Sequence, residues 1–173
     1  EIYTLSLHGA LPIFDYSGKK ALSLVKPHSV DDLATINSVI RLMPQTKGNE
    51  MPLEKYARFH DNVQLWYDEM TEYGLTEEEQ DILKDIIGIS YGICEAQEYL
   101  ILLTMHPKIG GFDLGWADRL RKAVAKKNPK DFEQLEKEFF KNAEEKQLSP
   151  NLTHYVWYQL IYTQRGYGFN KAH

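Results

Sequence analysis

Apolar residues recur at every third or fourth position through most of the chain, which is the spacing that places side chains on one face of an α-helix. The clearest case is residues 114–127, where Leu114, Ala117, Leu120 and Val124 fall on one face. The same spacing predicts helices over residues 30–42, 53–73, 77–87, 93–105, 114–127, a stretch that begins at 129, and 151–164. We therefore predict an all-α fold, an irregular bundle of about seven helices.

Capping residues mark the starts of several of these helices. Thr76 followed by Glu79 forms a capping-box sequence, and Ser29 with Asp32 makes a similar start. Ser149-Pro150 is a favourable beginning for the last helix, because proline fits the first turn. These signals agree with the helical spacing.

The N-terminal residues fit this pattern poorly. Residues 1–12 closely resemble the peptide obtained when a sequencing adapter is translated, so we exclude them from the fold; the alternative is a short terminal strand. Residues 13–16 have the composition of one short strand, with Ser17-Gly18 as a turn. The chain stops at His173, where a further helix is expected to begin, so we expect a piece of a longer reading frame.

Composition narrows the class of protein. With 173 residues, a hydrophobic fraction of 43% and 11 tyrosines, the chain favours a folded domain over disorder. Cys94 is the single cysteine, which excludes an internal disulfide. The longest apolar run, residues 99–105, is too short to cross a bilayer, so we expect no membrane partner and a cytoplasmic protein.

The charge is unevenly distributed along the chain. The net charge is −5, and residues 61–98 carry eleven carboxylates and one base, Lys84. No side-chain carboxylate follows Glu145, whereas Lys146, Arg165, Lys171 and His173 do. One part of the surface can therefore attract a polyanion that another part repels.

The helix expected at 114–127 is strongly basic. Asp113 is a good N-cap for it and Asn128-Pro129 ends it. From residue 119 to 130 it carries six basic side chains and no acid. Arg121 lies only about 50° from the centre of the apolar stripe, so it needs an anion or a hydrogen-bonding partner. A solvated basic face and a face that binds a polyanion both remain open.

The C-terminal segment is a second candidate for anion binding. Gly166 and Gly168 allow a sharp turn, and Asn170 is a natural N-cap for a following helix. Lys171 and His173 would lie in its first turn, where free N–H groups and the helix dipole favour a phosphate. The alternative is a Gly-rich loop between two helices.

Other chemistry finds little support in the sequence. The six histidines show no zinc-binding spacing, and we expect His60 and His106 at the surface or in loops. Gln97 and Glu98 are weak candidates on a polar helix face. No P-loop or dinucleotide fingerprint is present, and we expect no metal site in this chain.

Three motifs in order give the chain a resemblance to a known family. They are Tyr91-Gly-Ile-x-x-x-Gln-Glu98, Gly111-Phe-x-Leu-Gly-x-Ala-Asp-x-Leu-Arg-Lys-Ala-x-x-Lys-Lys127 and Gly166-Tyr-Gly-Phe-Asn-Lys-x-His173. The chain resembles the fingers region of the alpha subunit of bacterial, C-family DNA polymerase III. Ile13-Phe-x-x-Ser17 and Asp32-Leu-x-x-x-Asn-x-x-x-Arg41 resemble the segment that leads from palm to fingers, so the resemblance covers about residues 13–173.

The resemblance implies DNA-directed DNA polymerase activity in DNA replication, with deoxynucleoside triphosphates and template-primer DNA as substrates. It implies that the triphosphate is bound by Arg121, Lys122, Lys171 and His173, with further DNA or phosphate contacts at Arg41, Arg119, Lys126, Lys127 and Asn170. It implies Mg²⁺ held by palm aspartates that lie outside this chain, so we expect the chain alone to be inactive. The palm and thumb, and a sliding clamp bound through other regions, are its implied partners.

This sequence departs from the family pattern in three places. Lys122 stands where a second arginine is usual, Arg41-Leu-Met-Pro44 replaces the usual Arg-Pro-Gly-Pro, and Ala125 stands where glycine is common. Such drift is typical of a divergent member, for which a phage origin is one explanation. A non-catalytic helical nucleic-acid-binding module is the alternative function, and a helical interaction protein is a third.

Overall fold

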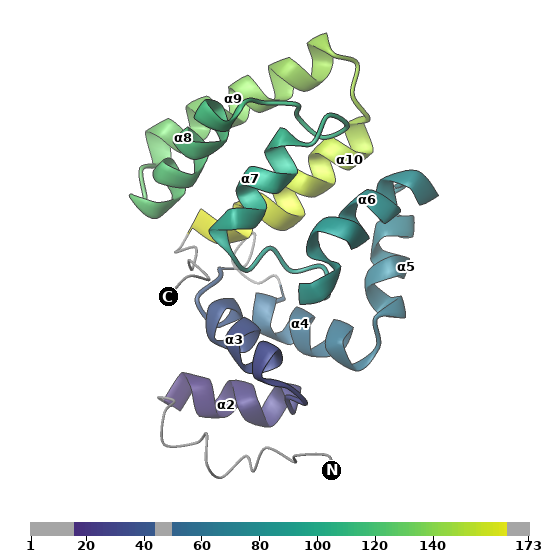
Figure 1. Ribbon diagram of the computed structural model, residues 1–173, viewed down its shortest axis with the longest axis vertical. Coiled ribbons are helices and arrows are strands. Elements are labelled where there is room, and N and C mark those ends of the chain that lie inside the picture. The colour runs from purple at the N-terminus through teal and green to yellow at the C-terminus, as the bar shows by residue number, and fades with distance from the viewer. Residues whose placement is uncertain (1–15, 44–49, 166–173) are drawn as a thin grey trace.

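The computed structural model describes residues 16–43 and 50–165, and these residues form helices and no β-sheet (Figure 1). The elements in order are α2 (Tyr16–Val25), α3 (Val30–Val39), α4 (Pro52–Asp61), α5 (Gln64–Glu72), α6 (Glu77–Ile87), the 3₁₀ turn η2 (Gly88–Ser90), α7 (Gln97–Met105), α8 (Leu114–Ala125), α9 (Pro129–Glu145), α10 (Pro150–His154), the π-helical η3 (Tyr155–Leu160) and the 3₁₀ η4 (Ile161–Arg165). The predicted all-α fold is confirmed.

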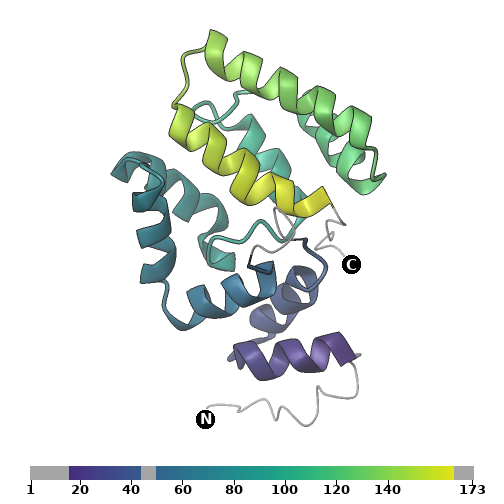
Figure 2. The ribbon, with the colours of Figure 1, turned by 180° about the vertical axis from the view of Figure 1, so that it is seen from behind.

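The helices form two groups along the long axis of the molecule. Helices α2, α3 and α4 lie at one end and α7, α8, α9 and α10 at the other, with α5 and α6 along one side (Figure 1). Seen from behind, α10, η3 and η4 run as one stretch beside α9 (Figure 2). The basic helix α8 packs against α7, α9 and η4.

One hydrophobic core joins the two groups. Its buried members run from Ala21 in α2 to Ile161 in η4. Trp66 and Trp157 are among its largest fully buried side chains. Burial of such a side chain stabilises the fold by about 1.5–3 kcal/mol. Trp66 joins α5 to η3 through Tyr155, and Trp157 joins η3 to α9 through Phe139.

The predicted caps are confirmed. Ser29, Thr76, Asp113, Asn128 and Ser149 each accept a backbone N–H from the first turn of the helix that follows. Thr76 also makes the reciprocal bond of the capping box, in which its backbone N–H donates to the carboxylate of Glu79 at 2.9 Å. These bonds fix the register in which each helix presents its apolar face.

The prediction of a single helix over residues 53–73 is wrong, because two helices occupy this stretch. Helix α4 ends at Asp61 and α5 begins at Gln64. Between them Asn62 is extended, with φ −144° and ψ 96°, and its side-chain oxygen accepts the N–H of Gln64 at 3.1 Å. Asparagine thus offers the backbone a bond that competes with continuation of the helix.

The helix expected at 93–105 begins later than predicted, at Gln97. Residues 93–96 are buried, and Ala96 is extended with φ −122° and ψ 149°. The buried side chain of Gln164 donates to the backbone oxygens of Cys94 at 2.8 Å and Ala96 at 2.9 Å. A hydrogen bond from a residue 68 positions further along the chain therefore keeps this segment extended, so that it does not join the helix.

Helix α2 was not predicted from the sequence. Tyr16, which was expected to end a strand, and Ser17-Gly18, expected as a turn, lie in its first turn. Residues 1–12 and 13–15 lie outside the described part of the chain. Ala21, Leu22 and Val25 bury one face of α2 in the core, and this packing against α3 and α4 overrides the turn preference of glycine.

Candidate functional site

Arg121 and Lys122 share one carboxylate on α8. The Nε of Arg121 donates to Oδ1 of Asp118 at 2.9 Å, and its Nη2 forms an ion pair with the same oxygen at 2.7 Å. The Nζ of Lys122 lies 2.7 Å from Oδ2 of the same Asp118. Hydrogen bonds from Lys122 and then from Arg121 hold the pKa of Asp118 below its usual value. Helical spacing of three and four residues makes this arrangement possible.

Arg121 also reaches across to the start of α7. Its Nη1 donates to Oε1 of Gln97 at 3.4 Å, near the upper limit for a hydrogen bond. Gln97 is the first residue of α7, which no side chain caps among the described residues. The segments 91–98 and 111–127, which the sequence singled out separately, therefore meet at this contact.

The need of Arg121 for a polar partner was predicted correctly. The partners are, however, groups of this same chain, Asp118 and Gln97, so no external polyanion is required to satisfy the guanidinium. Two cations against one carboxylate still leave a positive excess of charge. The side chains remain accessible, 32% for Arg121 and 58% for Lys122.

Two further segments, η4 and the segment after Arg41, also lie near the contact between α7 and α8. Gln164, in η4, binds the backbone just before Gln97, as described above. The N–H of Met43 donates to the oxygen of Thr163 in the same η4 at 3.0 Å, so the segment after Arg41 reaches η4 as well. The described chain therefore ends, at Arg165, beside the helix that carries Arg121.

The remaining candidate residues lie in several places. Arg119 pairs with Glu138 of α9 at 3.4 Å, and Trp116 donates to the same carboxylate at 2.7 Å. Burial raises the pKa of Glu138, but these two hydrogen bonds outweigh it and leave the pKa below its usual value. Arg119 thus holds α8 to α9 rather than facing Arg121.

Arg41, Lys126 and Lys127 are exposed. Arg41 follows α3, and the two lysines end α8, where Lys127 takes the left-handed conformation with φ 52°. Asn170, Lys171 and His173 lie outside the described residues, so their expected approach to Arg121 stays a prediction.

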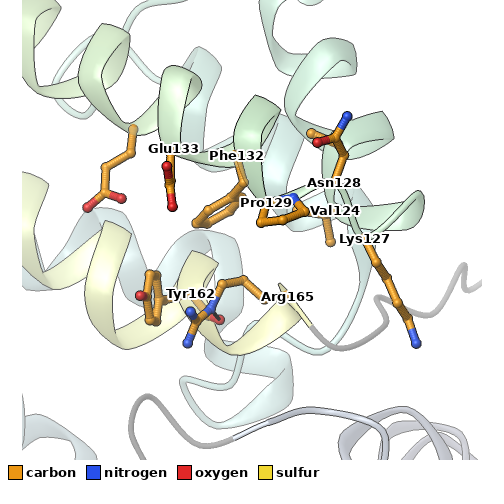
Figure 3. A pocket seen from close by; sticks show the side chains of 10 residues that line it. Val124, Lys127, Asn128, Pro129, Phe132, Glu133, Tyr162 and Arg165 are labelled. Carbon is orange, nitrogen blue, oxygen red and sulfur yellow. Dashed lines mark hydrogen bonds between the residues drawn. The ribbon is translucent and has the colours of Figure 1, made fainter.

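A pocket of 280 Å³ lies between the end of α8, the start of α9 and η4 (Figure 3). Phe132 and Tyr162 form its aromatic part, and the guanidinium of Arg165 stacks 3.1 Å from the centre of the Tyr162 ring. Glu133 and Glu136 also line it. These carboxylates disfavour a polyphosphate, and neither Arg121 nor Lys122 belongs to this pocket.

A second polar cluster lies around Asp32. His60 Nε2 is 3.4 Å from Oδ2 of Asp32, which also accepts the N–H of His28 at 2.8 Å. The expectation that His60 lies at the surface or in a loop is wrong, because its side chain is only 8% exposed and sits on α4 edge-on to Tyr91. Packing against Tyr91 explains the burial, since it gives the imidazole an aromatic neighbour on one side and a carboxylate on the other.

Sequence reasoning missed two residues of the site. Asp118 was recognised only as part of a motif, although its position three and four residues before the two cations was a usable signal. Gln164 is a fully buried polar side chain. Its burial depends on contacts with a distant segment, which no local pattern in the sequence reveals.

The described residues hold no metal-binding cluster and no membrane-spanning helix. No group of three or more His, Cys, Asp and Glu side chains there is placed to hold a metal ion. None of the described helices has the length and apolar character needed to cross a membrane.

Comparison with known proteins identifies the family. Residues 13–147 match the family described as the bacterial DNA polymerase III alpha subunit finger domain. The chain belongs to this family. No solved structure matches the chain.

Relatives of this finger domain are named as polymerases. The chain is 34% identical over 166 residues to the probable DNA polymerase YorL of Bacillus subtilis strain 168 and to a DNA-directed DNA polymerase of Bacillus phage SPbeta. It is 29% identical over 155 residues to the DNA polymerase III subunit alpha of Pasteurella multocida. These alignments cover 94%, 94% and 90% of this chain.

The expected resemblance to a divergent member of this family is therefore confirmed, and one of these relatives is a phage protein. The finger domain spans only 13% of the length of the first two relatives and 12% of the third.

Proposed function

We propose that this finger domain binds the incoming deoxynucleoside triphosphate in a replicative DNA-directed DNA polymerase. Arg121 and Lys122 bind the phosphates, and Lys171 and His173 complete the site. The observation that supports this most is the pair of accessible cations on α8, held together by Asp118 beside the start of α7. Their role is to neutralise and align the triphosphate.

The ion pairs with Asp118 do not prevent this role. Asp118 occupies the Nε–Nη2 edge of Arg121, whereas the Nη1 end makes only the 3.4 Å contact to Gln97 among the described residues. A phosphate forms shorter, charge-assisted bonds than that contact, so it can take the Nη1 end. The positive end of the α7 dipole lies on the same side and favours an anion there.

The rest of the polymerase supplies what this domain lacks. The proposal places two Mg²⁺ ions on palm carboxylates outside the chain. It places template-primer DNA against the exposed basic residues Arg41, Lys126 and Lys127, and against Asn170. Arg119 is engaged by Glu138 and is assigned to the joint between α8 and α9. Residues 13–173 form the finger unit, the clamp binds elsewhere, and the enzyme works in the cytoplasm.

Calorimetric titration of the chain with dATP tests the proposal. We expect dATP to bind and deoxyadenosine, which has no phosphate, not to bind. Arg121→Ala should weaken dATP binding about tenfold, because it removes charge-assisted hydrogen bonds. Lys141→Ala is the matched control, since Lys141 is an exposed base on α9 whose partner is Glu145. Equal affinities for the two variants would overturn the proposal.

A further inference from the structure

The contacts of Asp118 go beyond those of an ordinary surface ion pair. Both of its oxygens are used, one by Arg121 and one by Lys122. We propose that Asp118 is a positioning residue for nucleotide binding, which turns the Nη1–Nη2 end of Arg121 toward the triphosphate and holds Lys122 beside it. This inference rests on the proposed function and assigns a role to a carboxylate that does not itself touch the nucleotide.

The guanidinium geometry supports the assignment. Arginine offers two bidentate edges, one formed by Nε and Nη2 and the other by the two terminal nitrogens. Asp118 Oδ1 takes the first edge, at 2.9 and 2.7 Å. With that edge occupied, the terminal nitrogens are left for an anion, and the contact of Nη1 with Gln97 marks the direction in which they lie.

Pre-organisation gives the carboxylate an energetic role. Free arginine and lysine side chains each carry about 2 kcal/mol of rotamer entropy, which a ligand would otherwise have to overcome. Asp118 restricts both side chains before the nucleotide arrives. It also screens the repulsion between two neighbouring cations, which would otherwise separate when no anion is bound.

A competing interpretation predicts the opposite sign. If Asp118 only neutralised the two cations, it would compete with the triphosphate, and its removal would strengthen nucleotide binding. If it only stabilised the helix surface, its removal would change nothing, since exposed ion pairs contribute little. The positioning role alone predicts weaker binding that depends on the presence of Arg121.

The test uses single-nucleotide incorporation by the polymerase chain that carries this domain. Asp118→Asn keeps the size of the side chain and removes its charge. We expect a rise of about five- to tenfold in the apparent KM for dATP with kcat changed by less than about twofold, which is the signature of lost substrate binding. In an Arg121→Ala background the same substitution should raise the KM by a clearly smaller factor, because only the contact of Asp118 with Lys122 remains to be lost.

Glu145→Gln serves as the matched control, because Glu145 forms an exposed ion pair of i,i+4 spacing with Lys141 on α9. Circular dichroism confirms that each variant is folded. An unchanged or lower KM for Asp118→Asn, or an equal rise with and without Arg121, overturns the positioning role while the proposed function stands. An Arg121→Ala enzyme with wild-type kinetics overturns both.

Discussion

Arg121 donates a hydrogen bond from Nη1 to Oε1 of Gln97 across 3.4 Å, and this contact joins α8 to the first residue of α7. The two residues are 24 positions apart in the chain. Gln97 is nearly buried, whereas Arg121 is about one-third exposed. The guanidinium therefore lies at the boundary between the core and solvent.

This placement predicts the kinetic effect of Arg121→Ala in the complete polymerase. We expect a higher apparent KM for all four deoxynucleotides or slower incorporation, because the phosphates are common to all four. Steady-state and single-turnover kinetics measure the two effects. A change confined to one nucleotide, or rates equal to wild type in both assays, would contradict a phosphate-binding role.

Gln164 is expected to hold the segment before α7 in place. Gln164→Leu removes the donor to the buried oxygens of Cys94 and Ala96, and leaving such acceptors unsatisfied should lower the free energy of unfolding by about 2 kcal/mol or more. Urea denaturation measures the change.

The thiol of Cys94 provides an independent measure of the same contact. Burial first, and then the charge of Glu95, raise the pKa of this thiol, so wild-type Cys94 should resist alkylation at neutral pH. Gln164→Leu should increase the alkylation rate if it opens this segment. If Gln164→Leu changes neither the free energy of unfolding nor the alkylation rate of Cys94, Gln164 does not hold the segment before α7 in place.

Two neighbouring glycines give opposite predictions for stability. Gly92 has φ +79°, and a Cβ there would lie 2.3 Å from the Trp66 ring, so Gly92→Ala should destabilise the fold by about 2 kcal/mol or more. Gly88 has helical angles and nothing within 4 Å of an added Cβ, so Gly88→Ala should stabilise it by about 0.5–1 kcal/mol. Thermal unfolding of the two variants compares them directly, and shifts of the same sign would be inconsistent with this backbone geometry.

The pKa of Asp118 sets a pH prediction for the site. Because its folded-state pKa is depressed, the ion pairs with Lys122 and Arg121 are complete above the ordinary aspartate pKa of 3.8 and are lost only as pH falls through the lowered pKa. Between pH 5 and 8, Asp118 therefore stays ionised. Wild type and Asp118→Asn should show parallel pH profiles for dATP affinity over this range. Profiles that diverge above pH 5 would mean that Asp118 titrates there.

Helix positions could be predicted from the sequence where local chemistry determines them. The pair Thr76 and Glu79 correctly predicted the start of α6. The apolar stripe of α8 correctly predicted that Arg121 lies partly toward the core. Long-range contacts explain the failures. Gln164 delays the start of α7, and no residue near 93 in the sequence indicates this.

The candidate site could be predicted only in part, for a related reason. The pairing of Arg121 and Lys122 with Asp118 follows from helical spacing, but the contact with Gln97 depends on how α7 and α8 pack. The expected contributions of Lys171 and His173 lie outside the described residues. The phosphate-binding role expected of Lys171 and His173 therefore stays a prediction.

The most direct test of triphosphate binding at Arg121 is an NMR titration of the ¹⁵N-labelled chain with dATP, following the Nε–H signal of Arg121 and the backbone amide of Gln97. We predict that both signals shift and saturate together with dATP and stay in place with deoxyadenosine. Saturable dATP binding that leaves both signals unmoved, or equal shifts with deoxyadenosine, would contradict a triphosphate site at Arg121.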